Sequence, residues 1–155
     1  MTDSYIWEKI LERFYSMSIT DKKTGQIIKF PYFTKDEQGK ITNVFEPNET
    51  GDRPTNEVWF EIFPLHSQPR QQELGKAGRN RWTFGLQINV NAPRAIYSGT
   101  NVTDKVYDFI AANFKRGDIF DGIRVVQTAY RSSARLLDDY YSEPVTVMVQ
   151  ADLDN

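Results

Sequence analysis

The most regular pattern in the chain is the alternation in segment 81–94, RWTFGLQINVNAPR. Every second side chain between positions 82 and 92 is apolar, and the positions between them are polar or glycine. Because successive side chains of a strand point to opposite faces, this pattern predicts a long strand with one face in a core. The other face is polar and almost uncharged, which suits either plain solvent or a wet partner surface. Its amide side chains belong to Gln87, Asn89 and Asn91.

Three further segments have the composition of strands. Segment 58–65, VWFEIFPL, is a near-continuous apolar run that is typical of a buried strand. Segments 122–130, GIRVVQTAY, and 144–151, PVTVMVQA, predict two more strands. Segment 132–142 lies between these two, and we expect it to be a connector that contains a helical turn.

Two segments carry the three- and four-residue spacing of apolar side chains that predicts an amphipathic helix. Asp3 is placed to cap the first helix, which we expect to end before Ser18. Asp104 suits the N-terminal end of the second helix, and Gly117 suits its C-terminal end. The apolar stripes are Ile6, Ile10, Leu11 and Phe14 in the first helix, and Val102, Val106, Phe109, Ile110 and Phe114 in the second.

Segments 26–33 and 41–45 predict a hairpin whose turn is DEQGK at 36–40. Gly39 can adopt the positive φ that such a turn needs, and Pro31 points to an edge position. Taken in order, the elements predict an α+β fold in which a mostly antiparallel β-sheet packs on two α-helices. We find no linker or repeat, so the prediction is a single domain over 1–155.

The 39% of hydrophobic and 14% of aromatic residues indicate a globular protein rich in strand-forming residues. No apolar run approaches the roughly 18 residues that a membrane span requires. The first residues, MTDSYIWEKI, lack the basic start and apolar core of a signal peptide. We therefore expect synthesis in the cytoplasm and no membrane partner.

Charge is unevenly distributed, although the formal net value is only -2. Segment 36–61 carries seven acids and two bases, and five acids and no base follow Arg135. Segment 68–81 has the opposite sign, with four bases against Glu73. Complementary charge of this kind lets one copy of a chain dock on another, and ordinary solvated loops are the alternative. The interface candidates are Arg70, Lys76, Arg79 and Arg81 on the basic side, and Asp138, Asp139 and Glu143 on the acidic side.

Segment 67–80 joins the two strongest strands with more residues than a turn needs. It is either an arm that extends beyond the sheet or a disordered hairpin tip. Because it has few apolar residues and a basic excess, we expect the arm to order only on assembly.

Side chains that carry catalysis or hold metals are sparse. The chain has no cysteine, which excludes disulfides, thiol catalysis and thiolate metal sites. His66 is the only histidine, and the adjacent Ser67 would point to the opposite face of a strand. GKAG at 75–78 matches a GXXG nucleic-acid loop, but it lies between strands instead of helices. We expect no catalytic, metal or cofactor site. The remaining carboxylate pairs, Asp118/Asp121, Asp138/Asp139 and Asp152/Asp154, lie beside turns or termini and lack EF-hand spacing.

Several pieces of the chain, taken in order over about 45–149, resemble the tail terminator and tail completion proteins of long-tailed bacteriophages. They are FEPNE, VWFEIF, the Gly/Arg loop, RWTFGLQINVNAPR, SGTNVTDKVYDFIAANFKRGDIFDG and YSEPVTVMV. The most specific feature is their order: a G-x-Q-x-x-V strand that ends at Pro93, a glycine turn at Gly99, a helix ending in FKRG, and strands closing with PVTV. We expect segment 19–43, where the chain departs from the family, to be an insertion, so no residue roles transfer to it.

The resemblance implies a structural role in the virion. Family members form a six-subunit ring at the head-proximal end of the tail tube, end tube polymerisation and present a surface for head joining. The implied partners are further copies of the chain, the tail tube protein, the head-tail connector and DNA in transit. Assembly would take place in the host cytoplasm. Family members have no catalytic residues to transfer, so the expectation is a protein that is not an enzyme.

Three alternatives stay open at this point. The chain could instead be a head-tail connector adaptor or a tail tube subunit. A nucleic-acid-binding module would use the bases of segment 68–81, although the acidic pI of about 5.5 argues against a dominant role of this kind. A small hydrolase would have to use His66.

Overall fold

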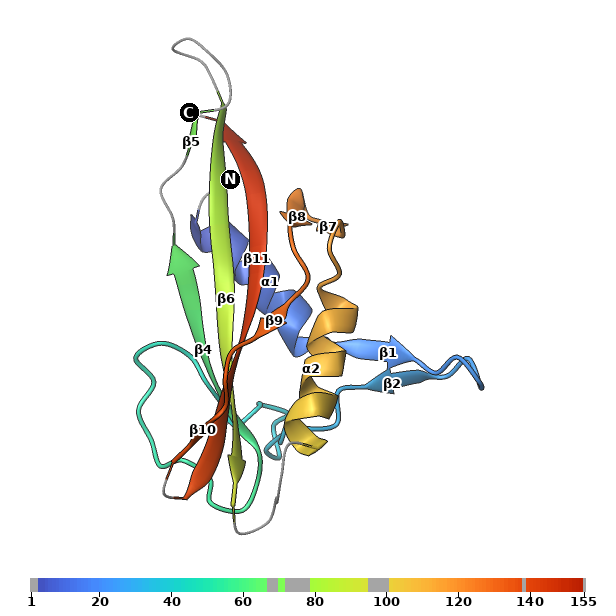
Figure 1. Ribbon diagram of the computed structural model, residues 1–155, viewed down its shortest axis with the longest axis vertical. Coiled ribbons are helices and arrows are strands. Elements are labelled where there is room, and N and C mark those ends of the chain that lie inside the picture. The colour runs from blue at the N-terminus through green and yellow to red at the C-terminus, as the bar shows by residue number, and fades with distance from the viewer. Residues whose placement is uncertain (1–2, 67–69, 72–78, 95–100, 138, 155) are drawn as a thin grey trace.

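The computed structural model describes residues 3–66, 70–71, 79–94, 101–137 and 139–154 of the chain. It confirms the predicted α+β class, with two helices packed on a mostly antiparallel, curled sheet (Figure 1). The elements are α1 (Asp3–Tyr15), β1 (Ser18–Thr20), β2 (Ile27–Lys29), β3 (Val44–Phe45), β4 (Trp59–His66), β5 (Arg70–Gln71), β6 (Arg79–Pro93), α2 (Asn101–Asn113), β7 (Ile119–Phe120), β8 (Ile123–Val125), β9 (Tyr130–Arg131), β10 (Arg135–Leu136) and β11 (Tyr140–Asp154).

A long antiparallel ribbon of β6 and β11 forms the centre of the sheet (Figure 1). Each strand has 15 residues, and the two pair along their full length, from Pro93 beside Tyr140 to Arg79 beside Asp154. The strand order is β3-β4-β6-β11-β8-β7, with β5 beside β6 and with β9 and β10 beside β11. Only β3 and β4 pair in parallel among the described strands.

The apolar row of β6 lies in the core, as its alternation predicts. Phe84, Leu86, Ile88 and Val90 are at most 1% exposed and pack in one cluster with both helices. Val145, Val147 and Val149 of β11 lie opposite this row and are fully buried. Because each large side chain contributes about 1.5–3 kcal/mol by burial, a shift of one residue in register would be strongly unfavourable.

Both predicted helical stripes face this core. Ile6, Ile10 and Phe14 of α1 are buried, as are Val106, Phe109 and Ile110 of α2. Gly117 follows α2 with a φ of 92°, as expected of a glycine after a helix end. Asp3 is itself the first helical residue, so it lies within the first turn instead of before it. Both helices have 13 residues, and none in the described part of the chain is long and apolar enough to cross a membrane.

The predicted N-terminal hairpin is wrong in its pairing. Strand β2 pairs with β1, not with segment 41–45, through a turn closed by backbone hydrogen bonds between Asp21 and Gln26 and between Gly25 and Asp21. Gly25 has a φ of 72°, which favours glycine at this turn. The predicted turn at 36–40 is confirmed, because Gly39 has a φ of 81° and Lys35 and Ile41 form an antiparallel bridge across it. The strands predicted on either side are wrong, since β3 runs parallel to β4.

The C-terminal half also differs from the prediction. The expected strand 122–130 is divided into β8 and β9, with residues 126–129 between them. The connector 132–142 has no helical turn in its described residues, because β10 pairs back on the beginning of β11. The edge of β11 that faces away from β6 pairs with β8, β9 and β10 at different positions along its length. Because these short strands pair with β11, the chain between Ile123 and Leu136 is extended and interrupted.

Candidate interaction surfaces

The middle strands β4, β6 and β11 present one face to the helices and a second face away from them. Cross-strand partners share a face, so the register identifies the side chains of this second face, which we call the open face. Glu61 is the only charged residue in the middle part of its three central rows, and it forms an ion pair with Arg53 at 3.8 Å; beyond this part the rows continue into Arg81 of β6 and Asp152 of β11, which lie opposite each other. The rows are Trp59, Glu61, Phe63 and Leu65; Thr83, Gly85, Gln87, Asn89 and Asn91; and Ser142, Pro144, Thr146, Met148 and Gln150.

The three predicted amides of the open face have different environments. Gln87 and Asn89 are half-buried, and Gln87 Nε2 donates a hydrogen bond to Asn89 Oδ1 at 3.0 Å. Asn91 is fully buried, which corrects its placement on an accessible polar surface. It lies beside Trp59, whose ring is covered by the Arg53 guanidinium at 5.6 Å. Of the three amide side chains, only those of Gln87 and Asn89 are therefore accessible.

The open face is less polar than the β6 sequence alone suggests. A side chain at Gly85 would meet Met148 Sδ at 2.8 Å and Leu65 Cβ at 3.1 Å, so these apolar side chains lie over the glycine. Phe63 is 38% exposed on the same face. Sequence reasoning missed this apolar patch because its residues come from strands that become neighbours only in the fold.

The candidate bases gather at one end of the ribbon, except for Lys76, which lies outside the described residues. Arg81 lies opposite Arg70 of β5 on one side and Asp152 of β11 on the other. Arg79 lies opposite Asp154. The structure therefore brings acidic residues of the same chain to the basic end, and the charge of this end is mixed.

The candidate acids are not brought together on one surface. Asp138 lies outside the described residues, and the exposed Asp139 lies at the ribbon end opposite the bases, where its carbonyl oxygen accepts a hydrogen bond from the Arg94 amide. Glu143 is only 3% exposed. Glu143 is therefore not an accessible interface residue, because its carboxylate is paired within its own chain.

Glu143 belongs to a small ionic network beneath the N-terminal end of α2. The Arg131 guanidinium donates through Nε to Glu143 and through Nη2 to Glu143 Oε2 at 3.0 Å. Arg131 Nη2 also lies 2.6 Å from Asp104 Oδ1, and its guanidinium lies over the Tyr107 ring. Hydrogen bonding to Glu143 is the largest effect on Arg131 and raises its pKa; desolvation opposes this effect, and hydrogen bonding to Asp104 adds to the rise. This network is structural, joining α2, β9 and β11.

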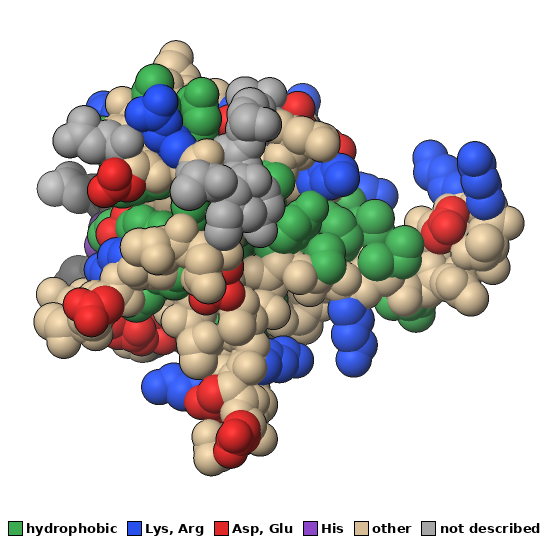
Figure 2. Space-filling view, turned by 90° about the horizontal axis from the view of Figure 1, so that it is seen from below, with side chains coloured by type: hydrophobic (Ala, Val, Ile, Leu, Met, Phe, Trp, Pro, Cys, Tyr) green, Lys and Arg blue, Asp and Glu red, His purple; other side chains and the backbone are tan. Residues whose placement is uncertain are grey.

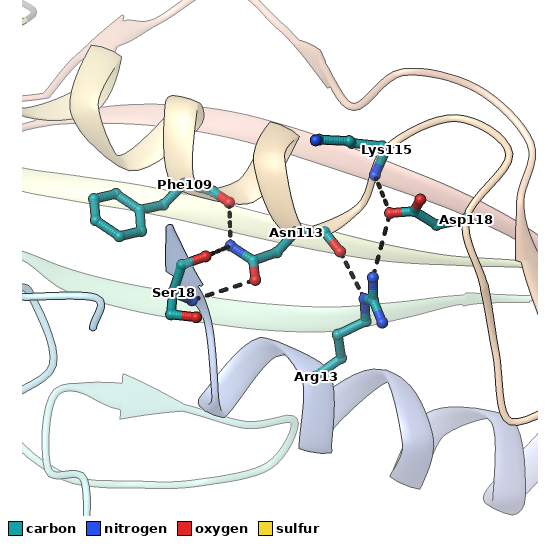
Figure 3. A network of polar contacts seen from close by, with 6 residues as sticks. All are labelled: Arg13, Ser18, Phe109, Asn113, Lys115 and Asp118. Carbon is teal, nitrogen blue, oxygen red and sulfur yellow. Dashed lines mark hydrogen bonds and ion pairs between the residues drawn. The ribbon is translucent and has the colours of Figure 1, made fainter. Parts of the chain in front are cut away.

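The β1–β2 hairpin, residues 18–29, is attached to the helices by a polar network (Figure 3). Asn113 Nδ2 donates to the carbonyl oxygens of Ser18 and Phe109 at 3.0 and 2.8 Å, and Asn113 Oδ1 accepts the Ser18 amide at 3.3 Å. Arg13 Nε donates to the Asn113 carbonyl oxygen at 2.6 Å, and Arg13 Nη2 reaches Asp118 at 3.3 Å. The base of the hairpin is thus held in a fixed position against α1 and α2.

Beyond this base, the β1–β2 hairpin projects from the body, with basic side chains gathered at its tip (Figures 1 and 2). The turn between its strands contains Lys22 and Lys23, both exposed. Ile27 is 72% exposed and Ile28 is 41% exposed. These are large apolar side chains in open positions next to cations, on the segment for which the sequence predicted no role.

An acidic surface lies along the outer edge of β4. Glu46 and Glu49 line a hollow of about 480 Å³ whose walls include Trp7, Pro64 and His66. Burial first, and then the neighbouring Glu49 carboxyl, raises the pKa of Glu46. Within the described residues, neither glutamate forms an ion pair with a basic side chain. The two carboxyl groups therefore concentrate negative charge that is not neutralised by a described cation.

His66, the remaining candidate for chemistry, stacks edge-on against Phe84 with ring centroids 5.0 Å apart. Among the described residues, no three His, Cys, Asp or Glu side chains converge as a metal site would require.

Comparison with known proteins gives a relation of fold alone. No family model and no curated protein matches the chain. One solved structure, whose name states no activity, ligand or partner, matches with a TM-score of 0.60 and 17% identity. The match covers 99% of this chain and 96% of that one, so the fold is shared over almost the whole length of both.

Proposed function

We propose that this protein is a tail terminator, or a closely related tail-assembly protein, of a long-tailed phage or prophage. It would act by binding copies of itself in a ring, six by the resemblance, at the head-proximal end of the tail tube. The ring would stop tube polymerisation and offer a surface to the head-tail connector. The proposal rests on the ordered sequence pieces that resemble this family, together with the surfaces described above.

The single structural observation that supports it best is the open face. Both helices pack on the other side of the sheet, which leaves a broad face whose middle part, from Thr83 to Asn91 of β6, has one charged residue in its rows, while Arg81 and Asp152 continue these rows at one end. Gln87 and Asn89 offer amide groups there, and Phe63 offers exposed apolar surface. A face of this composition suits a neighbouring subunit or DNA in transit, because it neither attracts nor repels phosphate strongly.

The mixed charge of the ribbon end argues against the nucleic-acid-binding alternative. Arg81 and Arg79 lie opposite Asp152 and Asp154, so the positive field that phosphate binding requires is reduced there. Tube capping distinguishes the terminator from the connector adaptor, because only a terminator stops tube polymerisation.

The test mixes the purified protein with its cognate tail tube subunit and measures tube length by electron microscopy. We expect shorter tubes with ring-shaped density at one end. Arg79→Glu should weaken this effect, because it reverses a charge at the basic end of the ribbon. Arg116→Glu makes the same charge change at an exposed position after α2 and serves as the control.

Unchanged tube lengths and bare tube ends at saturating wild-type protein would contradict the terminator proposal and favour the connector adaptor. Capping that is equally strong with Arg79→Glu would retain the function but remove the basic ribbon end from the interface.

A further inference from the structure

We propose that the β1–β2 hairpin is a docking arm that binds the acidic edge of a second copy of this chain. The acidic edge is defined as Glu46, Glu49 and Asp52 beside the outer edge of β4. This inference deepens the proposed ring and rests on it for its biological setting. It concerns a segment to which the family resemblance assigns no role.

The β1–β2 hairpin is exposed to an unusual degree for so small an element. Strands β1 and β2 have three residues each and pair only with each other among the described strands. A two-stranded hairpin of this size is marginally stable in water, and most proteins keep such elements against a core. This one instead projects and exposes Ile27 by 72%. Burial of Ile27 and Ile28 against a partner would stabilise both the hairpin and the complex.

The base of the hairpin is fixed in the conformation that binding would use. Asn113 makes three hydrogen bonds to the Ser18 backbone and to its own helix, and Phe30 at the end of β2 is 7% exposed in the core (Figure 3). The hairpin base is fixed on both strands, so its direction is set before a partner arrives. Preorganisation of this kind reduces the entropy lost on binding.

The hairpin and the segment that contains the acidic edge carry opposite charges. Residues 18–29 contain Lys22, Lys23 and Lys29 against Asp21, a formal charge of 3 − 1 = +2. Residues 46–57 contain one base against four acids, a formal charge of 1 − 4 = −3. Opposite charges on two exposed segments favour their association and disfavour contacts between like segments.

The hairpin tip and the acidic edge have different positions on the subunit. In Figure 1 the hairpin projects on the right, whereas the loop between β3 and β4 lies on the left, and Figure 2 also shows the hairpin standing clear of the body on one side. Tyr15, beside the hairpin base, interacts with Glu46 and Glu49, so the base lies near the acidic edge and it is the hairpin tip that projects away from this edge. Two different complementary surfaces on opposite sides of a subunit are what a head-to-tail contact requires, and such contacts generate closed rings.

The acidic edge also has a shape that suits the hairpin tip. The hollow of about 480 Å³ is lined by the two glutamates and by the apolar side chains of Trp7, Pro47 and Pro64. A lysine side chain has an apolar stem and a cationic end, so it can place its stem on these walls and its ammonium group between the carboxylates. Lys22 and Lys23 are the cations that the hairpin turn presents.

A charge-swap experiment tests the proposal. Variant A carries Lys22→Glu and Lys23→Glu, and variant B carries Glu49→Lys and Asp52→Lys, all at exposed positions. Each variant alone should self-associate at least about tenfold more weakly than the wild type, because like charges then face each other. An equimolar mixture of A and B should associate as strongly as the wild type, since each hairpin now meets an acceptor of opposite charge.

Self-association is measured by sedimentation velocity over a range of protein concentrations, and ring density is measured at the ends of cognate tubes. Lys105→Glu with Arg116→Glu reverses two charges at exposed positions outside both surfaces and should leave both measurements unchanged. Thermal unfolding of every variant establishes that it is folded.

The outcomes separate this inference from the proposed function. Association of A or B alone at wild-type strength, or no recovery in the mixture, would overturn the docking arm while capping by the wild type still supports the terminator. Swap-dependent association without capping would keep the docking arm and reject the terminator. A filter-binding measurement in which the wild type binds DNA and A does not, with self-association of A intact, would identify the hairpin as a nucleic-acid contact and overturn the proposal.

Discussion

At the scale of single residues, burial decides what a charge does. Glu143 lies among apolar side chains on the helix-facing side of β11, and Arg131 neutralises it. Arg131→Met should lower the free energy of unfolding by roughly 3 kcal/mol, because it leaves a buried carboxylate without its cation. Urea denaturation measures the loss. The double variant Arg131→Met, Glu143→Leu should recover most of it, and equal losses in the single and double variants would show that the pairing is unimportant.

Glu46 gives a second prediction at this scale, in the dependence of stability on pH. Its pKa is raised above 4.5, so the folded chain holds a proton that the unfolded chain has released, and stability falls as the pH rises through the raised pKa. Glu49 and the Tyr15 hydroxyl are the ionisable neighbours that interact with it, and His66 lines the same hollow.

Glu46→Gln should therefore be more stable than the wild type at neutral pH, with a flatter decline above pH 4.5. Thermal unfolding across this pH range measures the difference. Glu49→Gln is the companion variant, since it removes the neighbouring charge and should lower the pKa of Glu46. Identical pH profiles for all three proteins would mean that the two carboxyl groups do not interact.

At the scale of elements, the attachment of the β1–β2 hairpin depends on one amide side chain. Asn113→Ala should lower the free energy of unfolding by about 2 kcal/mol, because the Ser18 amide and carbonyl groups lose their partners. Amide hydrogen exchange should accelerate in β1 and β2 and change little in the β6–β11 ribbon. Asn113→Asp retains the acceptor for the Ser18 amide but places a carboxylate oxygen against the Ser18 and Phe109 carbonyl oxygens, so it should destabilise the hairpin at least as much as Asn113→Ala. Equal acceleration throughout the sheet would indicate global destabilisation instead of a local anchor.

The same element shows why part of the fold could not be predicted from the sequence. The register of β6 was predictable because its alternation is contained within one segment and persists over many residues. The partner of β2 was not, because its short strands carry little pattern and Asn113, which holds Ser18, lies 95 residues away. Likewise, the exposed-acid interpretation of Glu143 failed because its partner, Arg131, lies on a neighbouring strand.

At the scale of the whole molecule, the charges that the sequence separated into blocks are rearranged by the fold. The acidic residues at the end of β11 meet the basic end of β6, whereas Asp139 lies at the far end of the ribbon. The acidic segment before β4 and the tip of the basic β1–β2 hairpin lie on different sides of the body (Figure 1). Composition along the chain could indicate that complementary surfaces exist, but which surfaces are accessible depends on the topology.

The position of β11 has a consequence for the order in which the protein can fold during its synthesis. This strand is the last element of the described chain, yet it pairs with β6 on one edge and with β8, β9 and β10 on the other. Until the ribosome has released it, the apolar row of β6 lacks the valines that lie beside it, and three short strands lack their template. The nascent chain must therefore be synthesised through β11 before its core can close, and until then it presents aggregation-prone surface to the chaperones of the cell.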